Sequence, residues 1–347
     1  MVASPEVMLA GEQSRARILF VHNGLVRFVR IDRDLLAQRF RVTELLERNL
    51  GAVRPRTIAQ QVRNHDLVFC WFASWHSVTP IVLARLMRKP SVLIIGGYDI
   101  AKMPEIGYGH QRGGLKRQIA NMAIRCASVL VTHSWHCQQE AVLNVGADPA
   151  RVRVVYLGVP DSYGGFPDGR RESMVLTVGN VDRSNLTRKG HEPFVRAASL
   201  LPDVKFVLAG AWRDNSVRHL QRIAPANVCF TGWVEDSALA DLYARSSAYL
   251  QLSCHEGFGM SVAEAMLAGS IPIVSKVGSL PEVVGDVGRF VVREDPAAVA
   301  GAIRDVLASS TQARKAVRNR ILLNFSVGKR QKALWRIIDE LLNVLCY

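Results

Sequence analysis

The segment from Gln251 to Glu264 holds the residues whose types and spacing best suit chemistry: two glutamates on either side of a glycine-containing turn. An apolar run precedes the turn and a helical pattern follows it. Backbone N–H groups and the positive end of the helix would therefore face a bound anion, such as phosphate. Glu256 and Glu264 would repel that anion, but they can accept hydrogen bonds from sugar or ribose hydroxyls. A nucleotide sugar supplies both a diphosphate and hydroxyls, so the segment indicates a site for one.

Glu264 also has an interpretation that needs no ligand. Ser261 and Glu264 fit the S-x-x-E pattern of a capping box, which only starts a helix. Glu256 follows a buried-type strand and has no such explanation. Together with Gly257 and Gly259, which permit close backbone approach, Glu256 favours a binding site.

A second polar loop, between Gly179 and His191, carries three cations after another expected strand. Arg183, Arg188 and Lys189 could fold onto a diphosphate, with arginine as a fork and lysine as a point charge. An ordinary solvated surface loop explains the same residues equally well. The sequence has no Walker pattern, no G-x-G-x-x-G fingerprint and no G-x-S-x-G elbow, so kinase-like and ATPase chemistry lack support.

Short β-rich apolar runs alternate with amphipathic stretches along the whole chain and must position these two loops. The expected strands are Arg17–His22, Leu67–Trp71, Ser91–Gly96, Ser128–Thr132, Arg153–Leu157, Met174–Gly179, Val204–Gly210, Asn227–Gly232, Ala248–Leu252 and Ile271–Ser275. This alternation predicts two doubly wound α/β domains with mostly parallel sheets and a site in the cleft between them. A Gly/Pro-rich linker at 158–169 separates residues 1–160 from 161–325, and a helix over 326–347 is expected to pack back toward the first domain.

Length, charge and cysteine content narrow the class of protein. The 347 residues carry 44 Lys and Arg against 30 Asp and Glu, a net charge of +14, of which +10 lies in residues 1–160. Such asymmetry favours nucleic acid, an anionic membrane face or a phosphorylated substrate as partner, or simply a soluble Arg-rich surface. The six cysteines form no C-x-x-C pair, which predicts reduced thiols in a cytoplasmic protein. No apolar run is long enough to span a bilayer, and Met1–Arg17 lacks a signal-peptide pattern.

The stretch from Val178 to Gly288 resembles the C-terminal domain of retaining GT-B glycosyltransferases of family 4 type, the glycosyl transferases group 1 domain. The matching pieces are V-G-N…R-K-G-H-E, V-x-F-x-x-A-G, F-T-G-W-V, E-G-F-G-M-S-V-A-E-A-M-L-A-G-x-I-P-I-V and G-S-L-P-E-V-V-G-D-V-G. The resemblance implies a fold of two Rossmann-like domains. It also implies a hexosyltransferase that moves a sugar from a nucleotide diphosphate sugar to a glycan or lipid-linked acceptor, without a metal or other cofactor.

The resemblance also implies roles for individual residues. Glu256 would lie at the donor sugar, Glu264 would bind the ribose hydroxyls, and Lys189 would neutralise the diphosphate. Backbone groups near Val234 would meet the base. The donor would further touch the loop and the turn at Gly179, Asn180, Phe258, Gly259, Met260, Ser261 and Val262.

Two departures from the family pattern stand out. Asn180 occupies the place of the usual arginine after Gly179, so Arg183 or Arg188 would have to replace it. Gly96 occupies the place of a histidine that often follows a first-domain strand. Around it, Gly97 permits close substrate approach or simply a core turn, Asp99 is retained, and His110 could substitute on the acceptor side.

The basic first domain is expected to bind the acceptor, in cell-surface polysaccharide or glycolipid assembly. An amphipathic basic stretch over Leu115–Arg125 could lie on an anionic leaflet, which would make the protein peripheral on the inner membrane face, or it could be an ordinary core-facing helix. A metal site is not expected at His133, His136 and Cys137, because the sequence offers no fourth ligand nearby. We expect these three residues to lie in the cleft or the core. No nucleic-acid recognition motif is present. Two alternatives remain open: a non-catalytic GT-B partner or glycan-binding subunit, and a sugar-nucleotide epimerase of the same fold.

Overall fold

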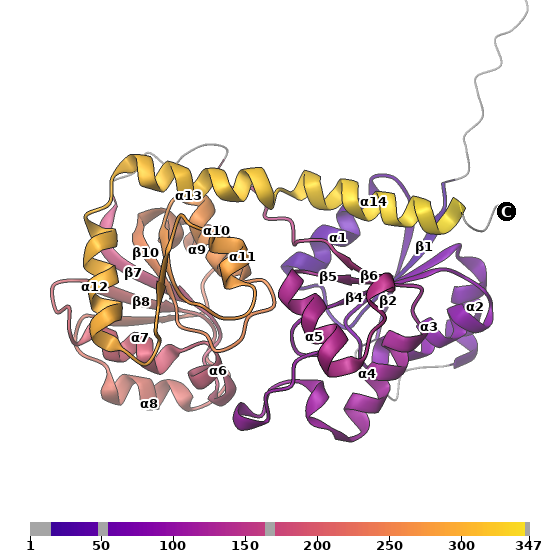
Figure 1. The fold of residues 1–347 in the computed structure, drawn as a ribbon, viewed down its shortest axis with the longest axis horizontal. Helices are drawn as coiled ribbons and strands as arrows, with labels where there is room; N and C mark the ends of the chain where they lie inside the picture. The colour runs from indigo at the N-terminus through magenta and orange to yellow at the C-terminus, as the bar shows by residue number, and fades with distance from the viewer. Residues whose placement is uncertain (1–14, 48–54, 164–170, 344–347) are drawn as a thin grey trace, which may run out of the picture.

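The structure is a computed structural model that describes residues 15–47, 55–163 and 171–343. Its first domain holds a parallel sheet in the strand order β2-β1-β3-β4-β5-β6, with helices on both faces (Figure 1). The elements in chain order are β1 (Arg17–His22), α1 (Arg27–Ala37), β2 (Arg41–Leu46), α2 (Pro55–Asn64), β3 (Leu67–Trp71), α3 (Trp75–Leu86), β4 (Ser91–Ile95), η1 (Pro104–Ile106), η2 (His110–Arg112), α4 (Gly114–Cys126), β5 (Val129–Thr132), α5 (Trp135–Val145), η3 (Pro149–Arg151) and β6 (Val152–Val154).

The second domain holds another parallel sheet of six strands, in the order β12-β11-β10-β7-β8-β9. Its elements are β7 (Glu172–Val178), α6 (Arg183–Arg188), α7 (His191–Ala198), β8 (Lys205–Ala209), α8 (Ser216–Ile223), β9 (Val228–Gly232), α9 (Asp236–Arg245), β10 (Ser246–Gln251), α10 (Met260–Leu267), β11 (Ile271–Ser275), α11 (Leu280–Val284), β12 (Arg289–Val291), α12 (Pro296–Leu307) and α13 (Thr311–Asn324), and the helix α14 (Val327–Asn343) follows it. Two parallel sheets with helices on their faces confirm the predicted fold class.

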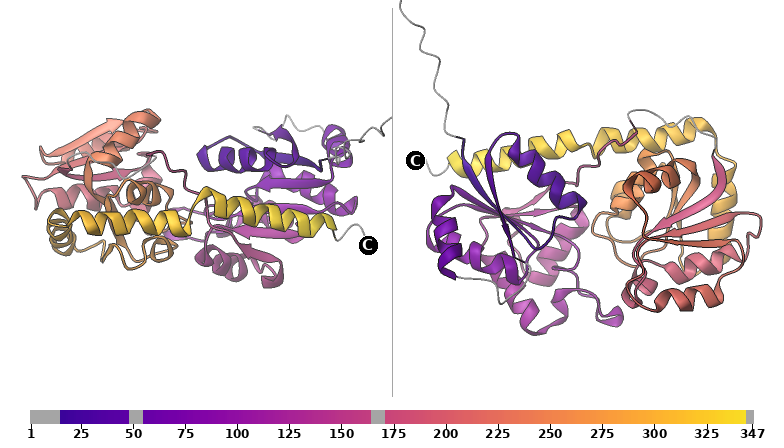
Figure 2. Two further views of the ribbon diagram at one scale, coloured as in Figure 1. Left: turned by 90° about the horizontal axis from the view of Figure 1, so that it is seen from above. Right: turned by 180° about the vertical axis from the view of Figure 1, so that it is seen from behind.

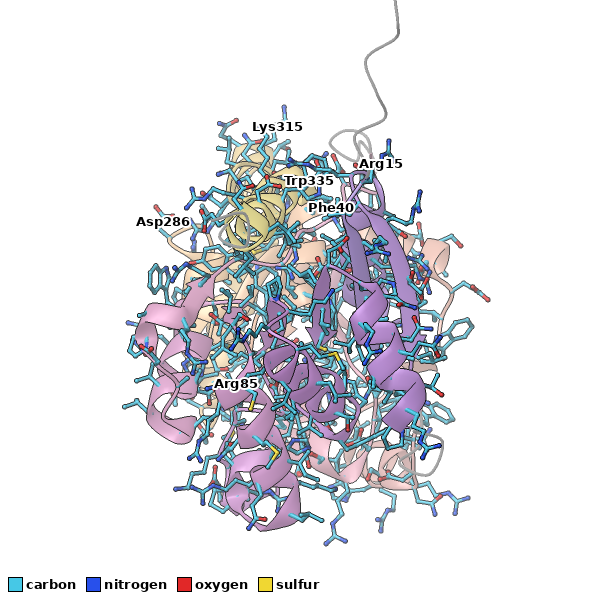
Figure 3. All side chains as sticks on the ribbon, turned by 90° about the vertical axis from the view of Figure 1, so that its right-hand side faces the viewer. Arg15, Phe40, Arg85, Asp286, Lys315 and Trp335 are labelled. Carbon is cyan, nitrogen blue, oxygen red and sulfur yellow. The ribbon has the colours of Figure 1, made fainter. Side chains whose placement is uncertain are left out.

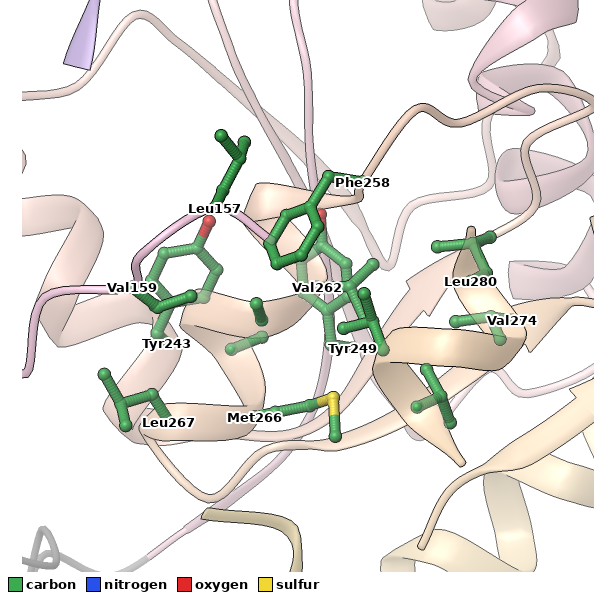
Figure 4. Packing of buried hydrophobic residues seen from close by; sticks show 14 of the residues in the cluster. Leu157, Val159, Tyr243, Tyr249, Phe258, Val262, Met266, Leu267, Val274 and Leu280 are labelled. Atoms are coloured by element: carbon green, nitrogen blue, oxygen red, sulfur yellow. The ribbon is translucent and has the colours of Figure 1, made fainter. Parts of the chain in front are cut away.

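The burial of each strand agrees with its place in the sheet. All five residues of β3 and of β4 are buried, as expected for central strands covered on both faces. Strand β2 lies at the edge of the first sheet, and all of its residues are exposed or partly exposed. Its polar Arg41 and Glu44 hid it from the sequence patterns. Figure 4 shows the apolar cluster beneath α10, where Phe258, Val262 and Met266 pack near Tyr249.

The long helix α14 leaves the second domain and packs on α1 of the first domain (Figures 1 and 2). Arg330 of α14 donates from Nε and Nη2 to the two carboxylate oxygens of Asp32, at 2.5 and 2.6 Å, and from Nη1 to the carbonyl oxygens of Val155 and Tyr156. Both charged side chains are fully buried. The contact therefore joins the carboxyl-terminal helix to the interior of the first domain.

The same helix is anchored at a second point by an aromatic residue. Trp335 donates its indole N–H to the carbonyl oxygen of Leu35, and the Arg39 guanidinium lies 5.4 Å from the ring centroids of both Phe40 and Trp335. Figure 3 looks onto this end of the molecule and labels both rings.

The connection between the domains begins at Gly158. Residues 164–169 of the predicted linker, residues 1–14 and Cys346 lie outside the described residues, so the expectations for them stay untested. The five cysteines that are described are all free thiols. In the described part of the chain, no helix is both long enough and apolar enough to cross a bilayer.

Candidate functional site

The site lies where the turn after β10 enters α10, at the carboxyl end of the second sheet. Gly259 caps α10 with a φ of 88°, a conformation that favours glycine, and the helix begins at Met260. Ser261 therefore lies inside the first turn, and the capping-box interpretation of Ser261 and Glu264 is wrong. The first N–H groups of α10 have no partner within the helix. Directly before the helix, Phe258 packs near Tyr156, with ring centroids 6.4 Å apart.

Glu256 and Lys189 form a buried ion pair at the centre of the site. Lys189 Nζ lies 2.5 Å from Glu256 Oε1, and the Ser253 hydroxyl donates to the same oxygen at 2.9 Å. Burial alone would raise the pKa of Glu256, but the positive charges of Lys189 and Arg188 outweigh it and hold that pKa below its usual value. No described residue donates a hydrogen bond to Glu256 Oε2, which leaves that oxygen free to accept from a ligand.

The loop between β7 and α7 is not irregular, because residues Arg183–Arg188 form the short helix α6. The Asp182 carboxylate caps it by accepting from the Asn185 N–H at 2.9 Å, a signal that the polar composition concealed. Arg188, at its end, donates to Asn185 Oδ1 and lies 4.9 Å from the centroid of the Tyr108 ring. This helix decides which arginine faces the site.

The structure brings Arg188 to the site and leaves Arg183 outside it. Arg188 contributes to the charge felt by Glu256, whereas the Arg183 side chain is exposed and its backbone N–H donates to Asp214. The carbonyl oxygen of Asn180 accepts from the Asn185 side chain, and Gly179 continues the pairing of β7 toward β8.

Glu264 faces a cavity of about 340 Å³ between the domains. Its Oε1 accepts from Arg27 Nη1 at 2.9 Å and its Oε2 accepts from the Tyr243 hydroxyl at 3.1 Å. Burial raises the pKa of Glu264 despite the charge of Arg27. Arg27 belongs to α1 of the first domain, so the sequence patterns gave no reason to pair it with Glu264. The lining also includes Ser162, Tyr163, Asp236 and Ser237.

Val234 lies partly buried after β9 and packs against the core, next to Trp233, whose side chain is 66% exposed. Neither residue lines the cavity at Glu264. The structure thus places Val234 on the same domain as the glutamates but outside the lining of the cavity at Glu264.

The predicted acceptor-side residues Gly96, Gly97 and Asp99 lie in a turn directly after β4. The buried Asp99 carboxylate accepts from the backbone N–H groups of Ala73 and Gly96, both at 3.0 Å, so it holds the turn together. Burial raises the pKa of Asp99 to about 6. His110 lies farther along, with its ring 4.8 Å from the Tyr98 ring.

A histidine does lie beside Gly96, but it comes from the next strand. A Cβ at Gly96 would lie 2.5 Å from the His133 ring, so the glycine makes room for that imidazole. His133 also stacks on Trp71, with ring centroids 5.4 Å apart. The sequence patterns could not show that His133 lies beside Gly96, because this contact depends on the pairing of β4 with β5.

The two domains meet through α5 of the first domain. The Glu282 carboxylate accepts from the backbone N–H groups of Trp135 and His136 at the start of this helix, each at 2.9 Å. Ser134 and Cys137 donate to the carbonyl oxygen of Gly257. The turn that carries Glu256 is therefore held directly by the first domain.

Three buried histidines predict a loss of stability in mild acid. Burial lowers the pKa of His133 to about 3 and the pKa values of His76 and His191 to about 4. Each side chain takes up a proton near pH 6.5 only when the chain unfolds, so stability falls as the pH drops below 6.5. At pH 5.5 each costs about 1.4 kcal/mol, offset by roughly 1 kcal/mol from Asp99, whose raised pKa acts in the opposite direction.

Urea denaturation at pH 7.0 and pH 5.5 checks this expectation. His133→Gln should reduce the difference between the two pH values by about 1.2 kcal/mol, because a small part of the cost at pH 5.5 is already present at pH 7.0. His219→Gln, at an exposed position beside Glu192, is the control for replacing an imidazole by an amide. An unchanged difference in His133→Gln would mean that His133 is already protonated in the folded protein.

Residues 170–321 match the family model described as "Glycosyl transferases group 1". A D-inositol 3-phosphate glycosyltransferase of Mycolicibacterium vanbaalenii is 28% identical over 277 residues, which cover 71% of this chain and 59% of that protein. An O-antigen chain mannosyltransferase B of Escherichia coli is 33% identical over 126 residues, or 34% of this chain and 32% of that protein. The chain thus spans less than two thirds of the length of these relatives.

The fold is also similar to that of solved structures. The crystal structure of Anabaena HepE in complex with UDP and glucose superimposes with a TM-score of 0.72 at 19% sequence identity, covering 94% of this chain and all of that chain. At this identity the likeness concerns the arrangement of the two domains.

Proposed function

Because residues 170–321 are a glycosyl transferases group 1 domain in a chain with the GT-B fold, we propose that the protein moves a sugar from a nucleotide diphosphate sugar to a glycan or lipid-linked acceptor. We also propose that it is a hexosyltransferase that retains the anomeric configuration. The observation that carries the proposal is the convergence of Lys189 and Arg188 on Glu256 beside the start of α10.

Donor binding uses the two glutamates differently. Glu264 keeps acceptor capacity beyond its bonds to Arg27 and Tyr243, because a carboxylate offers about four lone-pair sites, and it would take the ribose hydroxyls in the adjoining cavity. Glu256 would take a sugar hydroxyl through Oε2 while Oε1 holds Lys189 in place. The diphosphate would then lie against Lys189, Arg188 and the N–H groups at the start of α10.

The same cations would drive the chemistry. Negative charge grows on the diphosphate as the bond to the sugar breaks, and preorganised donors in a water-poor cleft stabilise that charge. The acceptor would attack from the face that the leaving phosphate vacates, which retains configuration. Glu256 is not assigned as a covalent nucleophile, since its Oε1 accepts from Lys189 and Ser253 and its Oε2 would accept from a sugar hydroxyl of the donor. With two cations at the diphosphate, this step requires no metal ion there.

The place of action is proposed from the surface of the first domain. Helix α4 exposes Leu115 (70%) and Met122 (53%) beside the basic residues Lys116 and Arg117. Such a surface suits an anionic membrane that carries a lipid-linked acceptor. We therefore place the enzyme in the cytoplasm, peripheral on the inner face of the membrane, in polysaccharide or glycolipid assembly.

The test is thermal stabilisation by a panel of nucleotides and nucleotide sugars. One donor should raise the Tm, since a ligand at 100 times its Kd adds about 2.7 kcal/mol to stability. In Glu264→Ala, affinity for that donor should fall about 10- to 100-fold, because hydrogen bonds to a charged group contribute roughly 1.5–3 kcal/mol.

Two matched variants separate the ribose role from general damage. Asp305→Ala changes an exposed carboxylate on α12 and should bind donor as the wild type does. Arg27→Ala removes the partner of Glu264 but keeps its carboxylate, so it should lose less affinity than Glu264→Ala. Equal affinity in Glu264→Ala and the wild type would remove the ribose role, and no shift with any donor would count against the proposed activity.

A further inference from the structure

A cluster of two histidines and a glutamate lies at the junction of the two domains, outside the donor site. His136 and Glu140 lie one turn apart on α5, and His255 comes from the turn after β10 in the second domain. His255 Nε2 lies 3.0 and 3.1 Å from the two carboxylate oxygens of Glu140, and His136 Nε2 lies 3.6 Å from Glu140 Oε2. One ligand atom from each residue lies within 4.8 Å of the others.

The hydrogen bonds of the described residues do not satisfy this cluster. His136 Nε2 is shielded from solvent and has no hydrogen-bond partner among them, since 3.6 Å is too long for one. The His255 side chain is only 5% exposed. A buried ring nitrogen that points toward a carboxylate and a second imidazole without bonding to either is costly, and a ligand shared by all three would remove that cost.

We propose that His136, Glu140 and His255 bind one zinc ion that bridges the two domains. In a tetrahedral zinc site with bonds of roughly 2.0–2.2 Å, neighbouring ligand atoms lie about 3.3–3.5 Å apart. The separations of 3.0 and 3.6 Å between the histidine nitrogens and the carboxylate already bracket that spacing. Small rotations of the two rings would bring the remaining pair into range.

The chemistry of the donor set selects the metal. Two imidazoles and one carboxylate suit zinc and its neighbours, whereas magnesium and calcium prefer oxygen ligands alone. Three protein ligands leave the fourth position to water. This inference does not depend on the proposed transferase activity, because it concerns other residues and a different ligand.

Zinc binding would strengthen the contact between the two domains. His255 precedes Glu256 directly, and α5 already binds Glu282 and the Gly257 carbonyl. Zinc would add a stronger link between α5 and the turn that carries Glu256. It would thereby favour the arrangement of the domains seen in Figure 1 over more open ones.

The experiment uses the untagged full chain, stripped with a chelator and titrated with Zn²⁺ alone in a calorimeter, in a Cys229→Ser background that removes an exposed thiol. One Zn²⁺ should bind per chain and raise the Tm. Co²⁺ in its place should give the visible absorption of a tetrahedral site with nitrogen and oxygen ligands.

His136→Gln and His255→Gln should each weaken Zn²⁺ binding by more than 100-fold, since removing even an outer-shell partner of a metal ligand costs about 10- to 100-fold. His219→Gln, an exposed histidine of the second domain, is the matched control and should bind as the parent does. Circular dichroism of the metal-free variants shows whether they fold, and Glu140→Gln offers a third substitution that keeps the side-chain shape. Absence of stoichiometric binding to the parent, or binding unchanged in both folded histidine variants, overturns the proposal and leaves the cluster as a hydrogen-bonded domain contact.

Discussion

Replacing Lys189 with methionine should lower kcat about 10²- to 10³-fold, the usual cost of losing one donor that stabilises charge growing on a leaving group. Methionine keeps most of the apolar stem of lysine, so the change removes the ammonium group and little packing. Lys189 Nζ is the cation that contacts Glu256, and Arg188 remains to hold part of the diphosphate. Steady-state kinetics with the donor found by thermal stabilisation measure the effect.

The control for this variant is Lys205→Met. Lys205 begins β8, so it lies at the amino ends of the strands, whereas the candidate site lies at their carboxyl ends. Lys205 is 51% exposed and lies 3.9 Å from Glu172, so kcat and stability should change little. If Lys189→Met instead raises KM and leaves kcat unchanged, Lys189 binds the donor equally in the ground and transition states. A folded Lys189→Met variant with wild-type kcat and KM would refute the proposed role.

The second large effect should appear in stability. Arg330→Met should lower the free energy of unfolding by about 3–5 kcal/mol, because it leaves the Asp32 carboxylate buried without its partner. The variant also loses the hydrogen bonds to the carbonyl oxygens of Val155 and Tyr156. Urea denaturation followed by circular dichroism measures the difference.

Two further variants isolate the buried charge. Arg336→Met removes an arginine of the same helix that is 82% exposed and forms an ion pair with Glu340, and it should change stability by less than about 0.5 kcal/mol. Asp32→Leu combined with Arg330→Met removes both charges and should recover part of the loss. If the double variant is as unstable as the sum of the single ones, the cost arises from packing and not from the unpaired carboxylate.

The parts of the site that could be predicted are those held by local sequence. Glu256 and Glu264 lie in one strand–turn–helix segment, and Lys189 directly precedes the glycine before α7, so their spacing along the chain sets their places. The fold class followed in the same way from strands that alternate with helices. The sequence did not predict which of Arg183 and Arg188 lies at the site, because their positions depend on the short helix α6. Its capping residue, Asp182, lies in a polar segment whose composition is typical of a loop.

The residues that could not be predicted depend on contacts between distant segments. His133 fills the space at Gly96 only because β5 lies beside β4, and Arg27 meets Glu264 across 237 positions of sequence. The partner of Glu140 in the second domain lies 115 positions away. None of these pairs has a periodicity or motif of its own, so the sequence patterns predicted only a cleft or core position for His136 and gave no partner for Arg27.

The packing of α14 on α1 has a consequence for synthesis on the ribosome. Asp32 and Arg330 are 298 positions apart. At roughly 5–20 residues per second, about 15–60 s pass between their translation. During that interval the nascent first domain holds a carboxylate without its arginine, and the surface that Trp335 covers stays open to solvent. The second domain can therefore fold before α14 covers the first domain, and a nascent chain stalled before α14 presents chaperones and proteases with a first domain that lacks this helix.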